Sequence, residues 1–599
     1  MKLMSGWTRP GFGDVVLFPF LLVFVRQYFW FLDHQILAWA LSVLATALLW
    51  ALVLRFKDAE ETTPLQFWLI VATPLLLIYG MRFALPDTSY DVLNYRIVSA
   101  ERALHGWPFI VGDFFPPFYP LNPAPDMLFG IFRHTLGYRL GPILNLIILL
   151  WTGTILNRML RPHVRNNWLR AVAVLLVLWT EQTFFLINTY LIDLLALPLL
   201  LQATYVSILP IESDRQAQRR LLLLALLLGL SAALKILNLA YAIPITFVYL
   251  LTLFRYKDSV QWTRLVSLVP IAVLVALFPL LPYSLYMYQK SGNPIFPMYN
   301  AIFKSVYWPT VNLYDGRWGP RGLIEALVWP LRVAFDSSRT GELLVYSGRI
   351  SIACIAAILS LAISWRVFQL RALNFAVLLG SLLWAINLTG YARYAIFVEL
   401  IGGVVIVGLM AQLLQRQQNV INVQAVPTVA GILLAAACIF QLSRATQYFV
   451  SSEWSQRPTI FVALQQHKAD ARFILRDYRL EVFLNESERR ELGDVGVWIE
   501  SGPLTSGFQS LLKPDAPILC AYIHDFFYSK EGREAFDRSL QQSSGKRIAS
   551  LCSKDDLASC TEVLARRGLQ IVEQHPITIF VYSKRTSLQM YLLKLEISS

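Results

Sequence analysis

The stretch QFWLIVATPLLLIYGMRFAL, residues 66–85, is followed directly by PDTSYDVLNYRIVSAERALHGWPF, residues 86–109. The first part is apolar over about 20 residues, the length that a helix needs to cross a bilayer. The second part begins with two aspartates, Asp87 and Asp91, that are four residues apart. The sequence therefore predicts a membrane-spanning helix that brings two carboxylates to a membrane surface.

Apolar runs of this kind recur along most of the chain. Of its 599 residues, 56% are hydrophobic and only 15% are charged. Because backbone polar groups in a bilayer must be satisfied internally, each run is expected to form a helix. We count about 13 candidate spans, at residues 14–32, 36–54, 65–83, 139–157, 168–187, 190–209, 220–236, 238–254, 265–287, 348–365, 373–390, 394–414 and 427–447.

The basic residues that give the net charge of +13 lie mostly in short loops between these runs. NRMLRPHVRNNWLR at 157–170 and DRQAQRR at 214–220 are examples. With this span count they share one side with the N-terminus, which the positive-inside rule makes cytoplasmic. The charge thus indicates orientation in an inner (cytoplasmic) membrane and not nucleic-acid binding. It predicts that the loops at 84–138 and 288–347 are external and that the C-terminus is periplasmic.

The last part of the chain, residues 450–599, contains no further spanning run. Strand-like segments such as APILCAYI at 516–523 alternate with helical ones such as REAFDRSLQQ at 533–542. We therefore expect a soluble periplasmic α/β domain of ordinary size. Cys552 and Cys560 lie in it; outside the cytoplasm they could form a disulfide, and reduced thiols are the alternative.

The acidic stretch at 86–109 has helical periodicity from Ser89 to His105, with apolar residues on one face. Asp87 precedes this helix and is well placed to cap it. Asp91 lies in the first turn, where capping does not explain it. The residues alone leave two readings of Asp91, a solvated surface charge and a catalytic base.

Four motifs resemble those of the GT-C superfamily of polytopic glycosyltransferases, which use polyprenyl-phosphate-linked sugars. They are found in order along residues 65–415 and face the predicted external side. DVLNYR is similar to the D-x-x-x-Y pattern in relatives of the lipid A aminoarabinose transferase and the protein O-mannosyltransferases. The four are DVLNYR at 91–96, LGLSAALKILNLAYAIP at 228–244, SGNPIFPMYN at 291–300 and GYARYAIFVELIGGVV at 390–405. The chain departs from the family in having two spans before the acidic loop, where the usual core has one.

The resemblance implies an all-α polytopic membrane protein with a C-terminal soluble α/β domain. N-terminal helices at 1–64 would precede a catalytic module at 65–449, and residues 450–599 would follow as the soluble domain. The donor would be a polyprenyl-phosphate sugar, and the acceptor a hydroxyl of a lipid-linked glycan, a lipid or a protein. Besides these partners, membrane lipids would surround the helices. A single displacement of this kind inverts the configuration at the anomeric carbon of the sugar.

The motifs also assign roles by resemblance. Asp91 would be the general base, and Asp87 would assist it, cap the helix or share a metal. Some relatives use a divalent ion and others do not, so the cofactor is left open. The expected substrate-binding residues are Tyr95, Arg96, Arg102, Lys235, Asn293, Arg393 and Tyr394. Lys235 and Arg393 are expected to bind the donor phosphate, because lysine and arginine are suited to phosphate recognition.

Two other classes of function are alternatives. A lipid-linked polysaccharide polymerase or ligase would depend on paired arginines and a histidine in one large late external loop. Arg317, Arg321 and Arg339 lie in such a loop, but it contains no histidine. A lipid or polysaccharide transporter would need an ion or substrate pathway, and the chain lacks the repeat symmetry of many transporters. The sequence contains no P-loop and no dinucleotide-binding fingerprint.

Overall fold

The structure is a computed structural model of the 599-residue chain. The segments that it describes are residues 10–56, 62–82, 87, 89, 91–106, 121–305, 308–312, 316–341, 348–419, 425–450, 481–483, 492–502, 505–513, 515–522, 530–542, 545–583 and 586–597.

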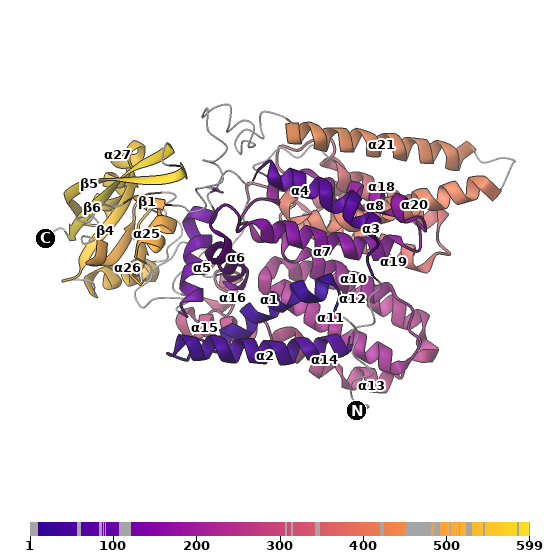
Figure 1. Cartoon of the computed structure of the whole chain (residues 1–599), viewed down its shortest axis with the longest axis horizontal. Coiled ribbons are helices and arrows are strands. Elements are labelled where there is room, and N and C mark those ends of the chain that lie inside the picture. Colours follow the sequence, from indigo (N-terminus) through magenta and orange to yellow (C-terminus); the bar gives the residue numbers. More distant parts are fainter. Residues whose placement is uncertain are drawn as a thin grey trace.

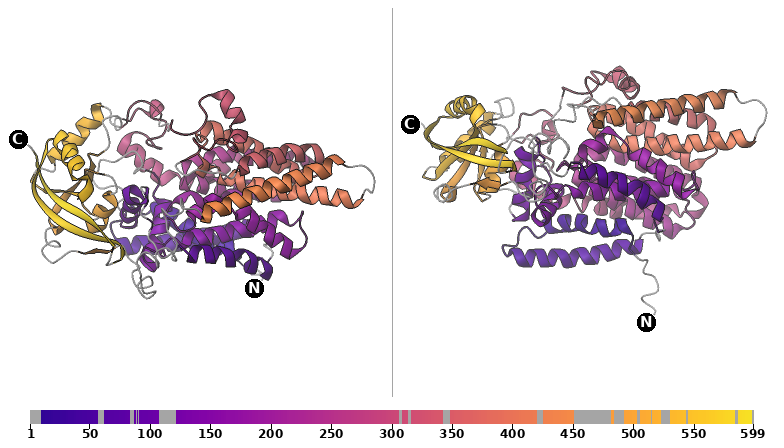
Figure 2. Two further views of the ribbon diagram at one scale, coloured as in Figure 1. Left: turned by 90° about the horizontal axis from the view of Figure 1, so that it is seen from above. Right: turned by 45° about the horizontal axis from the view of Figure 1, so that its top comes forward.

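A long body of helices carries a small mixed sheet at one end (Figure 1). Figure 2 shows from two further directions that the sheet lies beyond the ends of the long helices, in line with them. In the described segments six helices are long and apolar enough to cross a membrane, and a bent pair would make seven. The all-helical polytopic body and the C-terminal sheet are as expected, whereas the count of about 13 spans is not confirmed.

The first half of the helical body contains the following elements. They are α1 (Phe12–Gln27), α2 (Gln35–Phe56), α3 (Leu65–Phe67), η1 (Trp68–Ala72), α4 (Thr73–Gly80), η2 (Val92–Arg96), α5 (Ile97–Leu104), α6 (Ala124–Leu136), α7 (Ile143–Leu160), α8 (Asn167–Leu178), α9 (Glu181–Leu186), η3 (Ile192–Leu194), α10 (Leu197–Ile208) and α11 (Asp214–Leu234).

The second half continues with a further set of helices. They are η4 (Ile236–Asn238), α12 (Leu239–Arg255), η5 (Lys257–Ser259), α13 (Trp262–Ser267), α14 (Val269–Leu277), α15 (Leu281–Ser291), α16 (Asn300–Phe303), α17 (Leu323–Arg332), α18 (Arg349–Ile363), α19 (Phe368–Asn387), η6 (Ala392–Tyr394), α20 (Ile396–Asn419) and α21 (Ala425–Val450).

Several predicted spans are interrupted in the structure. The segment expected as one helix at 265–287 is divided between α13–α14 and α15, which meet at an angle of 66°. The segment expected at 190–209 begins with the short η3 and becomes regular only at α10. Hydropathy averages over such breaks, because a short interruption hardly changes the mean over a window of about 19 residues.

The expected helix at 89–105 is present and is divided into η2 and α5. Its surroundings differ from the prediction of an amphipathic helix along a membrane surface. Residues 92–98 are all buried, polar and apolar alike. The helix packs against α6 on one side and against α25 (Ser506–Leu512) of the C-terminal part on another.

The C-terminal sheet has six strands in the order β1-β5-β6-β4-β2-β3. The parallel strands β2, β3 and β4 adjoin an antiparallel group of β6, β5 and β1. The bounds of these elements are β1 (Glu481–Phe483), β2 (Val495–Glu500), β3 (Ile518–Cys520), α26 (Lys530–Gln542), β4 (Arg547–Ser553), η9 (Lys554–Asp556), α27 (Leu557–Arg566), β5 (Leu569–Ser583) and β6 (Thr586–Ile597). Cys552 and Cys560 form a disulfide that joins β4 to α27.

The two faces of this sheet have different partners. Val497 and Ile499 share a core with Phe536 of α26 and Leu564 of α27. Trp498, between them on β2, belongs to the same core as the helical body. Alternate residues of a strand point to opposite faces, so one face is covered by its own helices and the other faces α25 and the membrane part.

The helix formed by η2 and α5, called the acidic helix below, makes a close contact with α25 that depends on a glycine. Any Cβ at Gly507 would clash with the main-chain oxygen of Leu93 in η2. Nearby, Arg102 of α5 donates from Nη2 to the main-chain oxygen of Ala516 at 3.2 Å. The C-terminal part is thus packed directly against the helix that follows Asp91.

Candidate functional site

Three interruptions of apolar helices come together in the helical body. Lys235 lies in extended conformation between α11 and η4, with φ −158° and ψ 111°. Asp193 is in η3, before α10, and Arg393 is in η6, before α20. Irregular backbone at membrane depth is tolerated where it packs on protein or lines a cavity. Each of these breaks carries one charged side chain.

Asp193 and Lys235 form the tightest ion pair of the site. Lys235 donates from Nζ to Asp193 Oδ1 at 2.6 Å, and the Asp193 side chain is only 5% exposed. The Lys235 Nζ also lies 3.7 Å from the centre of the Tyr394 ring. Tyr394 is fixed in turn, because Tyr241 Oη donates to its main-chain oxygen at 2.5 Å. The lysine therefore points toward the other charges instead of extending along the helix to a membrane surface.

Arg393 lies between two carboxylates. Its Nη2 is 3.4 Å from Asp91 Oδ2, and its Nε is 3.6 Å from Asp193 Oδ2. These distances are longer than the 2.7–2.9 Å of a strong charge-assisted hydrogen bond. Asp91 is the more open carboxylate, with 24% of its side chain exposed against 5% for Asp193. A contact this loose leaves Asp91 available to a further partner.

A second buried pair lies behind Asp91 along the same helix. Arg96 donates from Nη1 to both oxygens of Asp126 in α6, at 3.2 and 3.4 Å. Its guanidinium carbon also lies 4.8 Å from the centre of the Tyr95 ring. Burial raises the pKa of Asp126 to about 6, and Arg96 opposes this rise. Arg96 is therefore committed to a protein carboxylate, unlike the more loosely held Arg393.

The ion pairs of Lys235 and Arg393 border a pocket. Its lining contains the charged Asp193, Lys235 and Arg393, together with Asn238 and Tyr394. Most of the other lining residues are apolar, among them Leu197, Leu200, Leu388, Ile396 and Phe397. A pocket lined by both charged and apolar side chains suits an amphipathic ligand with a charged head.

Asp87 binds main-chain N–H groups through both oxygens of its carboxylate, and its capping of the helix stays a prediction. Its Oδ1 accepts the main-chain N–H of Ser89 at 3.0 Å, and its Oδ2 accepts that of Tyr190 at 2.9 Å. Tyr138 Oη donates to the Asp87 main-chain oxygen at 2.6 Å. Both carboxylate oxygens thus bind main-chain donors and tie the start of the acidic helix to the segment before η3.

Two further residues expected to bind substrate lie in structural contacts. Arg102 reaches Ala516 of the C-terminal part, as described above. Asn293 organises its own loop: its Oδ1 accepts from the Ile295 main-chain N–H at 3.0 Å, and its Nδ2 donates to the Met298 main-chain oxygen at 3.0 Å. The structure brings Asp91, Lys235, Arg393 and Tyr394 together, with Tyr95 and Arg96 on the adjoining helix.

Asp193 and Asp126 are central to the arrangement and were not among the predicted residues. The sequence contained a signal for Asp193, because it is the only charged residue in the predicted span at 190–209. An ionisable residue within such a span is a functional-site hypothesis by default. Asp126 had no comparable signal, since its segment PAPDMLF resembles an ordinary helix start.

A metal site is not evident in the part of the chain that the structure describes. There, no group of three or more histidine, cysteine, aspartate or glutamate side chains is arranged so that it could hold a metal ion. The carboxylates of the site instead face arginine and lysine. The possibility that Asp87 and Asp91 share a metal stays an untested prediction.

Comparisons with known proteins identify two similar solved structures. No protein-family model matches the sequence, and no curated protein matches it. Two solved structures of ArnT from Cupriavidus metallidurans align with 88% of this chain at a TM-score of 0.47. The apo structure is 12% identical and is covered over 97% of its length. The structure bound to undecaprenyl phosphate is 13% identical and is covered over 98%. Similarity at this level carries no conclusion about function.

Proposed function

We propose that this protein is a membrane glycosyltransferase that takes a sugar from a polyprenyl-phosphate-linked donor. The acceptor is a hydroxyl group of a lipid-linked glycan, a lipid or a protein, and the reaction takes place at the periplasmic membrane face. The observation that carries the proposal is the convergence of Lys235 and Arg393 at one pocket with the loosely held Asp91 beside them. The four sequence motifs support the same reaction class.

The charges of the site fit a phosphate that enters from outside. The three cations and three carboxylates of this cluster balance each other without a ligand, and Asp91 contributes the most exposed of the carboxylates in contact with Arg393. A donor phosphate can replace Asp91 as the partner of Arg393, while Asp193 keeps both cations oriented. Buried cations are effective here because electrostatic interactions are stronger where water is excluded. The three cations are Arg96, Lys235 and Arg393, and the three carboxylates are Asp91, Asp126 and Asp193.

This exchange would prepare Asp91 for catalysis. Once Arg393 binds phosphate, the Asp91 carboxylate can accept the proton of the acceptor hydroxyl. The hydroxyl oxygen then forms a bond to the anomeric carbon as the bond from that carbon to the phosphate oxygen breaks. Polyprenyl phosphate leaves with its negative charge bound by Arg393 and Lys235. A single displacement of this kind inverts the configuration at the anomeric carbon.

Binding of the leaving group is the sharpest test, because it does not require the sugar to be known. Thermal stabilisation of the purified protein by undecaprenyl phosphate would be compared for wild type, Arg393→Ala and Lys235→Ala. We expect both substitutions to weaken binding by about tenfold or more, since hydrogen bonds to a charged group contribute about 1.5–3 kcal/mol each. Lys290→Ala, at an exposed lysine of α15, is the matched control and should bind as wild type does.

The possible outcomes distinguish specific binding of the phosphate at this site from a general attraction of phosphate to basic residues. Equal weakening in the Lys290 variant would mean that binding is unspecific. Unchanged binding in both Arg393→Ala and Lys235→Ala would overturn the phosphate site. Transport would be supported instead if the wild-type protein moved labelled polyprenyl phosphate across a vesicle membrane without transferring any sugar.

The orientation belongs to the same proposal. The short basic loops support a cytoplasmic N-terminus, and the reaction site and the C-terminal sheet would then lie on the periplasmic side. A reporter that is active only in the cytoplasm, fused after Ser599, should remain inactive. Activity of that reporter would reverse the assignment of both external loops.

A further inference from the structure

The short helix α17 has an unusual surface. It lies in the loop between α15 and α18 and is too short to cross a bilayer, because its 10 residues extend only about 15 Å. Nevertheless, large apolar side chains along one side of it are strongly exposed. They are Leu323 (68%), Ile324 (83%), Leu327 (58%), Val328 (51%), Leu331 (41%) and, just after the helix, Phe335 (93%).

The helix divides into three faces. At about 100° per residue, the exposed apolar residues occupy one continuous arc. Glu325 and Arg332 form a polar stripe at one edge of this arc. Ala326, Trp329 and Pro330 form the remaining face and are buried against the rest of the protein. Scattered exposed apolar residues need no explanation, whereas a contiguous patch bordered by polar residues indicates an interaction site.

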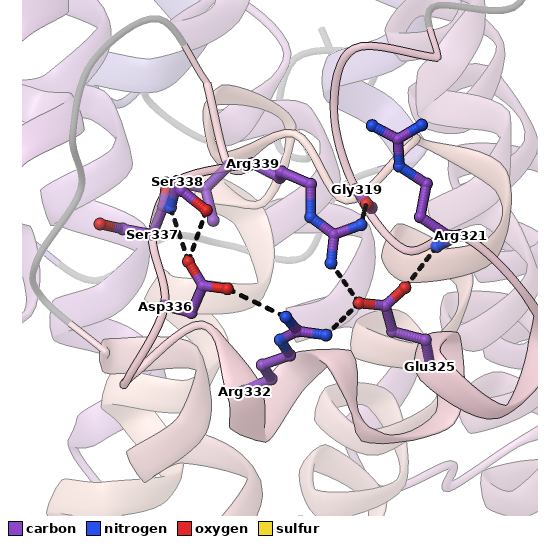
Figure 3. Close-up of polar contacts among 9 residues, drawn as sticks. Gly319, Arg321, Glu325, Arg332, Asp336, Ser337, Ser338 and Arg339 are labelled. Atoms are coloured by element: carbon purple, nitrogen blue, oxygen red, sulfur yellow. Dashed lines mark hydrogen bonds and ion pairs between the residues drawn. The ribbon is translucent and has the colours of Figure 1, made fainter.

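The polar edge is basic and partly neutralised from within (Figure 3). Glu325 binds both Arg332 and Arg339, and Asp336 accepts from Arg332 Nη2 at 3.0 Å. The guanidinium of Arg321 points away from this network (Figure 3). It forms no ion pair with any residue that the structure describes. Arg321 thus presents an unneutralised cation at the N-terminal end of the apolar face.

We propose that α17 lies in the outer leaflet of the membrane, with its apolar face among the acyl chains and Arg321 at anionic phospholipid headgroups. Helices with a broad apolar face and a basic polar edge bind membrane interfaces in this way. This surface goes beyond the glycosyltransferase proposal and does not depend on it.

The buried face connects this membrane contact to the Arg393 segment. Trp329 Nε1 donates to the main-chain oxygen of Gly390 at 3.4 Å. The main-chain N–H of Ala392 donates to the Thr340 main-chain oxygen at 2.6 Å. Gly319 is so close to the Thr389 carbonyl group that a Cβ there would clash. A helix held in the leaflet would therefore brace the turn from which Arg393 extends.

The depth of α17 can be measured directly in the full-length protein in nanodiscs. An environment-sensitive fluorophore would be attached to Ile324→Cys and, as the matched control, to Ser338→Cys on the exposed polar side of the same loop. Labelled wild type corrects for the native thiols. Quenching by phospholipids that carry a spin label near the headgroup would be compared with quenching by iodide in water.

We expect the lipid quencher to act severalfold more strongly at Ile324 than at Ser338, and iodide to show the opposite order. Adding phosphatidylglycerol to phosphatidylcholine should increase the lipid quenching at Ile324, and Arg321→Gln should remove that increase. Iodide quenching at Ile324 as strong as at Ser338 would place the helix in water and overturn the proposal. Protection from both quenchers would also overturn it, because protein, a second copy of the chain included, would then cover the face.

Discussion

Two clusters of arginines and carboxylates in this protein have similar composition and different surroundings. In one, Asp193 binds Lys235 and Arg393 in a pocket, with its own side chain 5% exposed. In the other, Asp336 binds Arg332 at the surface, with side chains 35% and 41% exposed (Figure 3). Water surrounds the second pair and screens it, so exposed pairs of this kind contribute little to stability. The first pair has lost most of its water and depends on its partners.

The comparison shows which property of an ion pair indicates a binding site in this molecule. The surface network has the better geometry, since Asp336 binds both Arg332 and Ser338 at 2.6–3.0 Å. The buried site has longer contacts at Arg393 and an open carboxylate at Asp91. Satisfied contacts at the surface hold a loop together, whereas loose contacts in a buried pocket leave charges ready for a ligand. Burial, and not the number of contacts, distinguishes the candidate site.

The largest expected effect is at Asp91. Asp91→Asn preserves the shape of the side chain and removes its basicity. Because a general base contributes about 10²–10⁴-fold, we expect sugar transfer to fall by that factor while undecaprenyl phosphate still binds. Single-turnover transfer and thermal stabilisation by the lipid measure the two effects separately. Turnover above about a tenth of wild type would remove Asp91 from the role of base.

Asp87→Asn is the control for that experiment. Asparagine keeps one oxygen acceptor and replaces the other by an amide NH₂, so either Ser89 or Tyr190 loses its acceptor. Leaving a buried donor without a partner costs about 1–3 kcal/mol. We therefore expect less stable protein with nearly normal transfer per folded molecule, in contrast to Asp91→Asn. If both variants folded normally and lost transfer equally, a site shared by the two carboxylates would be favoured.

The second expected effect tests the comparison itself. Asp193→Ala leaves Lys235 and Arg393 facing each other without their shared anion, which should destabilise the protein by about 3–5 kcal/mol. Asp336→Ala removes the corresponding carboxylate of the surface network and should cost less than about 1 kcal/mol. Reversible unfolding of both variants in mixed micelles gives the two values. Similar losses would show that burial does not control these pairs.

A smaller effect is expected from the support of the acidic helix. Gly507→Leu introduces a side chain where even a Cβ would clash with the carbonyl oxygen of Leu93. A displacement of about 1 Å near a reacting group can cost up to 10²-fold in rate. We expect a smaller decrease of the transfer rate here, about tenfold. Gly493→Ala is the control, because a Cβ at Gly493 would meet nothing within 4 Å. If both variants transferred sugar as fast as wild type, the contact between the C-terminal part and the acidic helix would not be needed for catalysis.

The smallest effect concerns the pH dependence of the surface network. Hydrogen bonds from the hydroxyl and main-chain N–H of Ser338, and then from Arg332, lower the pKa of Asp336 from 3.8 to about 2. A lowered pKa means that the contribution is fully present above about pH 4 and is lost as the pH falls toward 2. The difference in unfolding midpoint between wild type and Asp336→Asn should be constant from pH 7 to 5 and shrink below about pH 4. A difference that changes near neutral pH would point to another group.

The sequence by itself predicted the helical body and identified several of the charged residues of the site. Long apolar runs predicted membrane helices such as α2, α12 and α20, because a helix in lipid needs only length and hydrophobicity. Alternating strand-like segments predicted the C-terminal sheet. Lys235 and Arg393 were found through two of the motifs, and both residue types are suited to phosphate recognition. Those features are local and can be recognised in one window of sequence.

The tertiary structure decided which charges meet. Asp193 lies 42 residues before Lys235, and Asp91 lies 302 residues before Arg393; no local pattern encodes either pairing. It also decided that Arg102 and Asn293 make structural contacts and that Asp87 binds the backbone through both oxygens. Sequence periodicity reports which face of a helix is apolar, but not what covers the polar face. At α5 the polar face is covered by the C-terminal sheet with α25, whereas at α17 no protein segment covers the apolar face in the part of the chain that the structure describes. The reason is that packing between distant segments, and not local propensity, determines what each surface touches.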